Sequence, residues 1–196
     1  MSASHTKETF SARLSSPAGI LALSHWTGCR RTGPMDSARS FRWASSADYD
    51  LLADIMFDAV RNGESRYTER QRSAWVPARR SGSEWVARLA MQDIVIAEQD
   101  GRALGFMSLA DGGYVDFAYI RPEAQRTGLF RQLLSRIVDR AIATGEPVLW
   151  THASLMAEPA FAAFGFSVRK RERIGIGEEL LDRCEMELRL PVSEPR

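Results

Sequence analysis

Residues 93–144 constrain the fold more than any other part of the chain, because three strand-like segments are followed directly by one long amphipathic helix. The strand-like segments alternate or cluster apolar residues and are separated by glycine turns, which is typical of consecutive antiparallel strands. They span 93–99, 103–109 and 114–120, and the turns are Asp100-Gly101 and Asp111-Gly112-Gly113. The sequence therefore predicts an antiparallel meander.

The helix that follows is predicted over residues 128–144. Its apolar residues recur three and four positions apart, as one buried helix face requires. They are Phe130, Leu133, Leu134, Ile137, Val138 and Ala141. Gly145 stands where a left-handed residue commonly ends a helix.

Shorter elements are predicted on both sides of this region. A strand at 41–43 precedes three helices, which begin near Ser46, Thr68 and Ser83, and the pattern Thr68-x-x-Gln71 is a capping box. A strand at 148–153, a helix at 157–164 and two paired strands at 166–173 and 182–190 complete the chain. The order predicts an α/β fold of the α+β type, with a mixed, mostly antiparallel sheet of six to seven strands flanked by helices.

The N-terminal segment differs from the rest. Residues 1–38 are dense in Ser, Thr, Gly and Pro and lack sustained periodicity, which predicts a disordered or weakly ordered extension before a domain at 39–192. The apolar run 20–23 is too short and too late for a typical export signal. Met35 stands just before the ordered pattern, so a start at that residue stays open as an alternative.

Composition excludes several classes of function. Hydrophobic residues make up 44% of the chain and the formal net charge is +1, which predicts a globular domain that does not bind nucleic acid or a membrane. Two distant cysteines, Cys29 and Cys184, indicate a reducing compartment, and we expect a cytoplasmic protein. His5, His25 and His152 lack ligand-like spacing, so no metal is predicted.

The segment 125–131 is the strongest indication of a ligand. It passes from a loop into the predicted long helix, and the start of a helix offers unpaired N–H groups and a partial positive charge to a phosphate. Gly128 allows close approach to the backbone, and Arg126 and Arg131 add charge. The P-loop and the Rossmann fingerprint are both absent from the sequence.

Gln125-x-x-Gly128 resembles the Q/R-x-x-G-x-G/A pyrophosphate loop of the GNAT superfamily of N-acetyltransferases. A second resemblance lies downstream, in Ser154, Ala157, Phe161 and the terminal Gly165-Phe166. The resemblance covers residues 41–190. It implies a V-shaped opening between the fourth and fifth strands, where acetyl-CoA binds as cosubstrate and an amine attacks its thioester directly.

The resemblance also implies which residues contact the cosubstrate. The pantetheine arm would pair with the strand at Ala118–Ile120, and the pyrophosphate would bind to the N–H groups of the following loop. The predicted cosubstrate-binding residues are Ala118, Tyr119, Ile120, Gln125, Arg126, Thr127, Gly128, Leu129, Phe130, Arg131, Ser154, Ala157 and Phe161.

An alkyl ammonium with a pKa of about 10 needs a base at neutral pH. Asp116 is the first candidate, because Asp is disfavoured within a strand, and a solvated or arginine-paired carboxylate is the alternative. Glu98 and His152 are weaker candidates for the base. Ser154 is a candidate general acid, because Phe161 occupies the position where many family members carry the tyrosine that protonates the leaving group.

The sequence thus predicts an N-acetyltransferase that acts on an amine of a small molecule or a protein. The alternative is a catalytically weak acyl-CoA-binding regulatory module, which Phe161 favours. Phe161 is one departure from the family pattern. A second is Phe130, which stands where the pyrophosphate loop of the family has Gly or Ala. The acceptor amine and the acyl length are not encoded in a recognisable motif, and a homodimer stays open.

Overall fold

The structure, a computed structural model, describes residues 38–191. The predicted N-terminal extension lies outside these residues except for Ala38, as do Cys29, His5 and His25. Within the described range the chain forms seven strands and five α-helices, with three short 3-10 turns between them. The predicted fold class is therefore confirmed.

The first sheet contains four antiparallel strands in the order β1-β2-β3-β4. They span Ser40–Trp43 (β1), Gln92–Gln99 (β2), Arg102–Ala110 (β3) and Ala118–Ile120 (β4). The predicted meander is confirmed as β2-β3-β4, and β1 adds to its far edge by pairing with β2.

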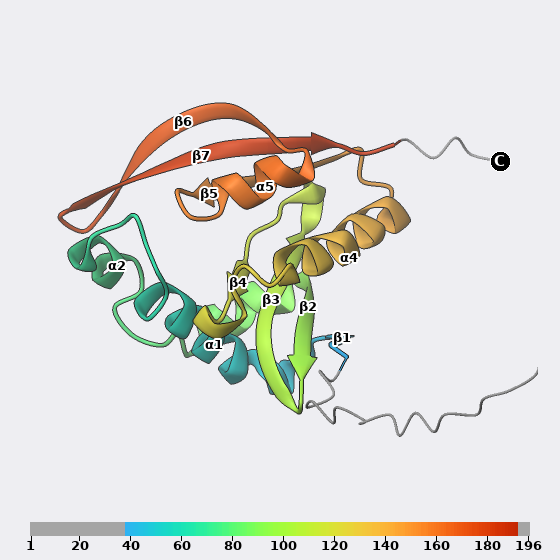
Figure 1. Ribbon diagram of the computed structural model, residues 1–196, viewed down its shortest axis with the longest axis horizontal. Helices are drawn as coiled ribbons and strands as arrows, with labels where there is room; N and C mark the ends of the chain where they lie inside the picture. The colour runs from blue at the N-terminus through green and yellow to red at the C-terminus, as the bar shows by residue number, and fades with distance from the viewer. Residues whose placement is uncertain (1–37, 192–196) are drawn as a thin grey trace, which may run out of the picture. The chain divides into compact units, whose positions relative to one another are not determined.

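The second sheet contains three antiparallel strands in the order β5-β7-β6. They span Val148–Ser154 (β5), Ser167–Ile176 (β6) and Glu179–Arg189 (β7). The β6-β7 hairpin is longer than the sequence predicts, because pairing continues to Ile176 and Glu179 at its tip. Figure 1 shows this hairpin in red at the top, above the first sheet.

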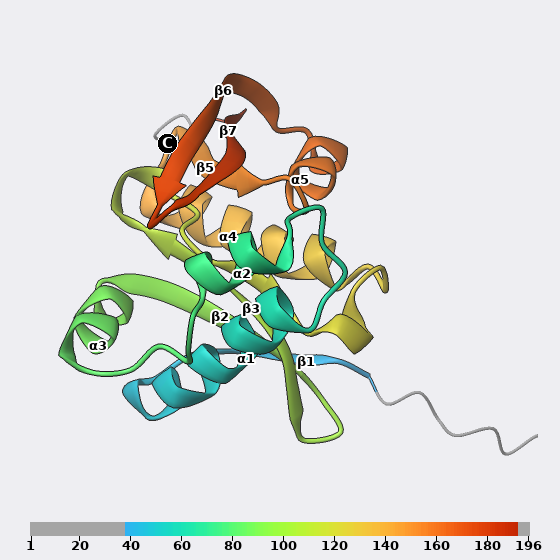
Figure 2. The ribbon, with the colours of Figure 1, turned by 90° about the vertical axis from the view of Figure 1, so that its left-hand side faces the viewer.

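The helices flank the two sheets. They are α1 (Tyr49–Arg61), α2 (Glu69–Trp75), α3 (Ser83–Ala90), α4 (Leu129–Thr144) and α5 (Glu158–Phe164). Figure 2 shows α1 and α2 nearest the viewer and α4 behind them. Two apolar clusters match this arrangement, since Leu133 and Ile137 of α4 belong to one and Leu52 and Ile55 of α1 to the other.

The predicted strand at 114–120 is wrong in its first half, since only Ala118–Ile120 pairs regularly with β3. Val115 packs in the α4 cluster, whereas Phe117 packs in the α1 cluster. Side chains two residues apart in a regular strand share a face, so the pleat must break near Asp116. Tyr114 makes isolated bridges instead, antiparallel to Ala110 and parallel to Trp150.

The Tyr114–Trp150 bridge is where the two sheets meet. The N–H of Val115 donates to the carbonyl of Trp150 at 2.8 Å, and the Thr151 hydroxyl donates to the carbonyl of Val115 at 2.8 Å. Gly113 is required here, because its φ is +73° and a Cβ atom would overlap the carbonyl oxygen of Val148. From this apex β4 and β5 belong to different sheets, which opens the predicted V between the fourth and fifth strands.

Candidate active site

A central cavity of about 480 Å³ opens into this V. Its walls come from the end of β4, the 125–128 loop, the start of α4, the end of β5, and α5. A further wall is formed by α1, α2 and the loop between them. The predicted residues that line the cavity are Ala118, Tyr119, Ile120, Gln125, Arg126, Gly128, Phe130, Arg131, Ser154 and Ala157.

The 125–128 loop has an unusual backbone. Arg126 and Gly128 have positive φ angles of 61° and 80°, and Gly128 is the N-cap of α4. A Cβ atom on Gly128 would meet no heavy atom within 4 Å, so the space beside the loop is open. The first turn of α4 begins here, so the N–H groups of its first residues face this space without partners inside the helix.

Side chains fix the loop from both sides. Gln125 donates from Nε2 to the carbonyl of Ile120 at 3.0 Å and so joins the loop to the end of β4. Thr127 points away from the cavity, where its Oγ1 accepts a hydrogen bond from Arg39 at 2.8 Å and donates to the carbonyl of Ala124. Leu129 is buried in the core. Thr127 and Leu129 therefore reach a ligand only through their backbones.

The two phenylalanines that depart from the family pattern, Phe130 and Phe161, pack against each other. Phe130 and Phe161 meet edge to face with ring centroids 4.9 Å apart, and Phe161 is 1% exposed. Phe161 also contacts Phe166 and does not line the cavity. Phe130 lines the cavity while packing on that cluster, and its backbone N–H belongs to the first turn of α4, where no partner inside the helix is available. Direct contact of Phe161 with the cosubstrate stays a prediction.

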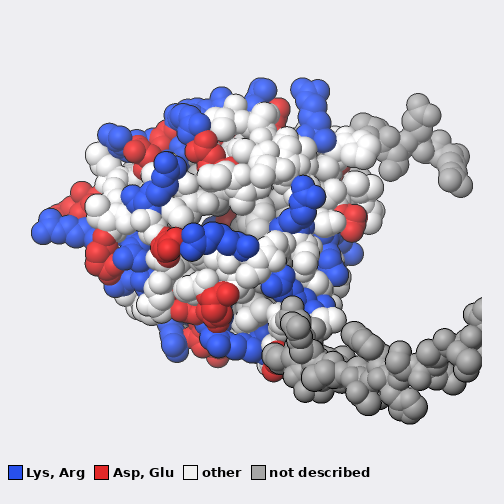
Figure 3. All heavy atoms as spheres, in the orientation of Figure 1, with Lys and Arg blue, Asp and Glu red and all other residues white. Residues whose placement is uncertain are grey.

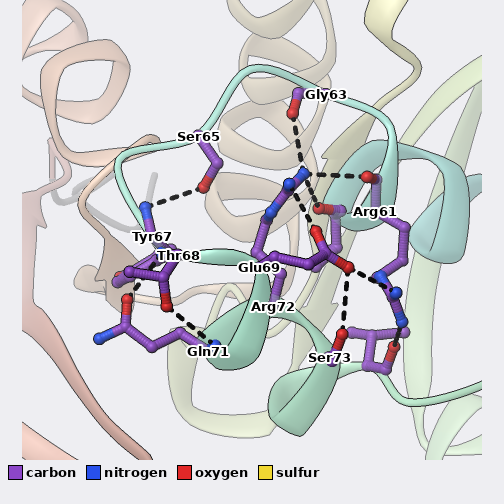
Figure 4. A network of polar contacts seen from close by, with 11 residues as sticks. Arg61, Gly63, Ser65, Tyr67, Thr68, Glu69, Gln71, Arg72 and Ser73 are labelled. Carbon is purple, nitrogen blue, oxygen red and sulfur yellow. Dashed lines mark hydrogen bonds and ion pairs between the residues drawn. The ribbon is translucent and has the colours of Figure 1, made fainter.

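No side chain in the wall formed by α1 and α2 was predicted as a catalytic or cosubstrate-binding residue. Arg72 donates to the carbonyls of Arg61 at 2.9 Å and Gly63 at 3.3 Å, and to Glu69 at 2.7 Å. Glu69 also accepts from Arg61 at 2.7 Å, as Figure 4 shows. The network caps the end of α1 and holds α2 against it. The Thr68 capping box that the sequence predicts at the start of α2 is present.

Tyr67 joins the α1–α2 wall to the second sheet. Its hydroxyl donates to the carbonyl of Asp182 at 2.6 Å and accepts from the N–H of Leu155 at 3.0 Å. Burial raises the pKa of this phenol. Trp75 contacts the Tyr67 ring edge to face at 6.0 Å and lines the cavity.

Asp116 lies beside the cavity and does not line it. Its side chain is 6% exposed, and it accepts two hydrogen bonds from Arg88, at 2.6 and 2.9 Å, and one from Gln92 at 2.8 Å. These bonds use three of its roughly four acceptor positions. The contacts match the arginine-paired alternative, and a role of Asp116 as base stays a prediction.

A cluster of titratable groups lies at the apex. The Tyr114 hydroxyl is 3.3 Å from Nδ1 of His152, and Nε2 of His152 is 3.7 Å from a Glu172 carboxylate oxygen. The Tyr114 ring stacks on Trp150 at 4.3 Å. Burial, followed by the positive charge of Arg183, lowers the pKa of His152. The imidazole is therefore neutral at pH 7.

The sequence predicted a protein without a metal site and without affinity for a membrane or nucleic acid. Among residues 38–191 no group of His, Cys, Asp and Glu side chains is arranged to hold a metal ion. Within the same range no helix is both long and apolar enough to cross a membrane. Figure 3 shows acidic and basic side chains intermixed on one face, which agrees with the net charge of +1.

Comparisons with known proteins bear on the family. Residues 64–190 match the family model of the acetyltransferase (GNAT) domain. The chain is 30% identical to the uncharacterized N-acetyltransferase YafP of Escherichia coli K12 over 128 residues, which cover 65% of this chain and 80% of that protein. These matches are with acetyltransferases and give no support to the binding-only alternative.

Two solved structures share the fold. A GCN5-related N-acetyltransferase from Rhodopseudomonas palustris is 26% identical with a TM-score of 0.71, covering 81% of this chain and all of that one. A phosphinothricin acetyltransferase from Sinorhizobium meliloti in complex with AcCoA is 22% identical with a TM-score of 0.61, covering 78% and 88%. Given the family match, the protein is an acetyltransferase, and the chain belongs to the GNAT family.

Proposed function

We propose that the enzyme transfers an acetyl group from acetyl-CoA to the primary amine of a small molecule. The observation that carries this proposal is the central cavity, which brings ten predicted cosubstrate-binding residues to one surface. The residues come from four separate segments of the chain, and only the fold unites them.

The residues fit the chemistry of acetyl-CoA. The start of α4 offers backbone N–H groups and the positive end of the helix dipole to a pyrophosphate. Arg126 and Arg131 line the same space, and the absent Cβ of Gly128 leaves room for the phosphate oxygens. Arg126 is 3.2 Å from Glu64 across the cavity, in an exposed ion pair that a phosphate can replace.

The strand β4 fits the pantetheine arm. It pairs with β3 along one edge, and no strand among the described residues pairs regularly with its other edge, which faces the cavity. An extended amide chain can add to such an edge through backbone hydrogen bonds. With the pyrophosphate at Gly128, the arm would run from Ile120 toward Ala118, so that the thioester points to the apex of the V.

The cosubstrate supplies an activated acetyl group when it is bound. The protein would orient that group and stabilise negative charge on its carbonyl oxygen with a backbone N–H near Ala118. Ser154 lines the cavity and could be reached by the departing thiolate. A thiol has a pKa of about 8.5, so its thiolate is a good leaving group even if no acid assists it.

Contacts between α2 and the β6-β7 hairpin close the side of the cavity where the acceptor amine would enter. This closure favours a small molecule over a protein as the acceptor. Gln71 donates from Nε2 to the carbonyl of Leu180 at 2.7 Å, and Tyr67 bonds to the carbonyl of Asp182, so α2 is tied to the β6-β7 hairpin. A folded protein would have to separate these elements to present a lysine at the apex. A small amine needs no such rearrangement.

A mass-spectrometric screen tests the proposal. The protein is incubated with acetyl-CoA and a panel that contains L-amino acids, phosphinothricin, polyamines, aminoglycosides and lysine peptides. We expect a mass gain of one acetyl group on a small amine, together with release of CoA. Acetylation of the peptides alone would contradict the small-molecule assignment, and CoA release without any acetylated amine would contradict the transfer reaction.

A further inference from the structure

Three side chains from three segments form a polar chain at the apex. Tyr114 precedes β4, His152 lies on β5 and Glu172 on β6. The Tyr114 hydroxyl oxygen is 3.3 Å from Nδ1 of His152, and Nε2 of the same ring is 3.7 Å from Oε1 of Glu172. The imidazole thus lies between a phenol and a carboxylate that also pairs with Arg183 at 2.6 Å and Lys170 at 3.2 Å.

The row of Tyr114, His152 and Glu172 side chains is aligned with the central cavity. His152 and Ser154 are two residues apart on β5, so their side chains share a face of the strand, about 7 Å apart along it. Ser154 and Ala118 line the cavity, whereas Tyr114 and His152 lie nearer the bridge where the sheets meet. A thioester directed from Ile120 toward Ala118 therefore points at these two side chains.

The two neighbours bear on which nitrogen of His152 carries the proton. The Glu172 carboxylate, 3.7 Å from Nε2, makes no hydrogen bond to it but favours an N–H there by its negative charge. Nδ1 then carries the lone pair, and the Tyr114 hydroxyl donates to it. A phenol that donates to an imidazole keeps its own oxygen lone pairs available to an ammonium group.

We propose that Tyr114 and His152 form the proton relay that deprotonates the acceptor ammonium. This inference rests on the proposed acetyl transfer. The ammonium gives one proton to the Tyr114 oxygen as the Tyr114 proton passes to Nδ1 of His152, and the imidazolium is stabilised by Glu172. The neutral amine then forms the C–N bond as the C–S bond breaks, and its second proton neutralises the departing thiolate. Each turnover leaves one proton on His152, which passes to water.

The surroundings of His152 suit this role. Arg183 and Glu185 face it from β7, Lys170 and Glu172 from β6, and the Tyr114 phenol from the segment before β4. Burial and Arg183 outweigh the carboxylates, so the pKa of His152 lies below its usual value of about 6.5. The ring is ready to accept a proton at pH 7, and its 23% exposed side chain can return that proton to solvent.

Asp116 is the competing base. Its carboxylate is engaged by Arg88 and Gln92, and, like Tyr114 and His152, it does not line the cavity. A base that must break these bonds before it can act is at a disadvantage to an imidazole with one lone pair directed at a phenol.

Steady-state kinetics separate the two candidates with the small amine that the screen identifies. We expect His152→Gln and Tyr114→Phe each to lower kcat at pH 7 by at least 100-fold, with little change in acetyl-CoA affinity. Tyr49→Phe removes a hydroxyl from α1, outside the cavity and the apex, and is the control for Tyr114→Phe. The double variant should lose no more than either single one, because a relay fails as a unit.

The pH profile distinguishes a relay from a structural role. Without the base the rate follows the fraction of neutral amine, so the deficit of His152→Gln should shrink about tenfold per pH unit between pH 7 and the pKa of the amine. A merely destabilised variant would show a constant deficit and a lowered melting temperature. A 100-fold loss in Asp116→Asn combined with normal kcat in His152→Gln would overturn the relay.

Nitrogen NMR of the parent protein tests the geometry without any acceptor. We expect Nε2 of His152 to carry the proton and Nδ1 to be unprotonated at pH 7, with the Nδ1 shift changed in Tyr114→Phe. A proton on Nδ1 would overturn the relay whatever the kinetics show. Failure of the proposed function would appear differently, as an absence of acetyl transfer by the parent protein.

Discussion

Two walls of the central cavity are held in place by different means. The 125–128 loop and the start of α4 present backbone groups, and their shape depends on positive φ angles at Arg126 and Gly128. The opposite wall, from α1 and α2, depends on side chains such as Arg72 and Tyr67. The comparison teaches how each kind of wall appears in a sequence. A site built from backbone groups restricts the residue type at a few positions of fixed spacing, whereas a network of side chains produces no pattern of fixed spacing.

The difference should also appear in how each wall responds to mutation. A backbone site tolerates the loss of most side chains and is sensitive to an added group. A side-chain network is sensitive to the loss of its central member, because the groups left behind become unpaired. Three experiments test this contrast.

The largest effect is expected from Arg72→Ala. The change leaves the carbonyls of Arg61 and Gly63 and the Glu69 carboxylate without the guanidinium, which lowers the free energy of unfolding by about 2–3 kcal/mol. Urea unfolding measures the loss, and hydrogen exchange should locate it in residues 61–75. Arg70→Ala, which removes an exposed arginine from the same helix, is the control. Equal losses in both variants would show that the network does not hold the wall.

A smaller effect is expected from Gly128→Asp, which adds a carboxylate to the backbone wall. The positive φ makes the substitution strained, at a cost of about 1–2 kcal/mol in stability. Repulsion of the pyrophosphate should lower acetyl-CoA affinity at least tenfold, or about 1.4 kcal/mol, as measured by calorimetry. Thioesters of dephosphorylated pantetheine should lose much less.

Gly177→Asp is the matched control. Gly177 lies in the β6-β7 hairpin, has a φ of +61° and has open space where a Cβ would stand. It carries the same strain away from the cavity, so it should lose stability and retain affinity. A folded Gly128→Asp protein that binds acetyl-CoA as tightly as the parent would place the phosphates elsewhere.

The smallest effect is the pH dependence of the side-chain wall. A hydrogen bond from Ser73, together with Arg61, lowers the pKa of Glu69 in the folded state. Its contribution to stability is therefore present above the unfolded pKa of about 4.3 and is lost as the pH falls below that value. The stability difference between the parent and Glu69→Gln should favour the parent at pH 7 and fade by pH 3.5 in urea titrations. Glu84→Gln, at an exposed position in α3, should show no such change.

The sequence predicted the backbone wall and most of the fold for the same reason. Turn glycines, helix caps and periodic apolar residues act locally, so the meander and α4 could be predicted. The strand at 114–120 was wrong because the pleat breaks at Asp116, whose partners Arg88 and Gln92 are 24–28 residues away. The contact of Arg39 with Thr127 joins residues 88 positions apart, and no local pattern predicts it.

The candidate site shows the same limit. His152 was a weak candidate in the sequence because nothing nearby identifies Tyr114 and Glu172 as its neighbours. Asp116 was the first candidate because an acid within a strand is conspicuous, although its arginine lies on another element. The residue types were visible in the sequence, and their pairing was a property of the tertiary structure.

The packing of Phe130 on Phe161 has an evolutionary consequence. With ring centroids 4.9 Å apart and planes at 89°, each ring occupies space that the other would otherwise leave empty. A glycine or alanine at 130 would leave a void beside the ring of residue 161, and a larger side chain at 161 would fill it. Among relatives of this chain, positions 130 and 161 should therefore covary: a small residue at the first with tyrosine at the second, or phenylalanine at both.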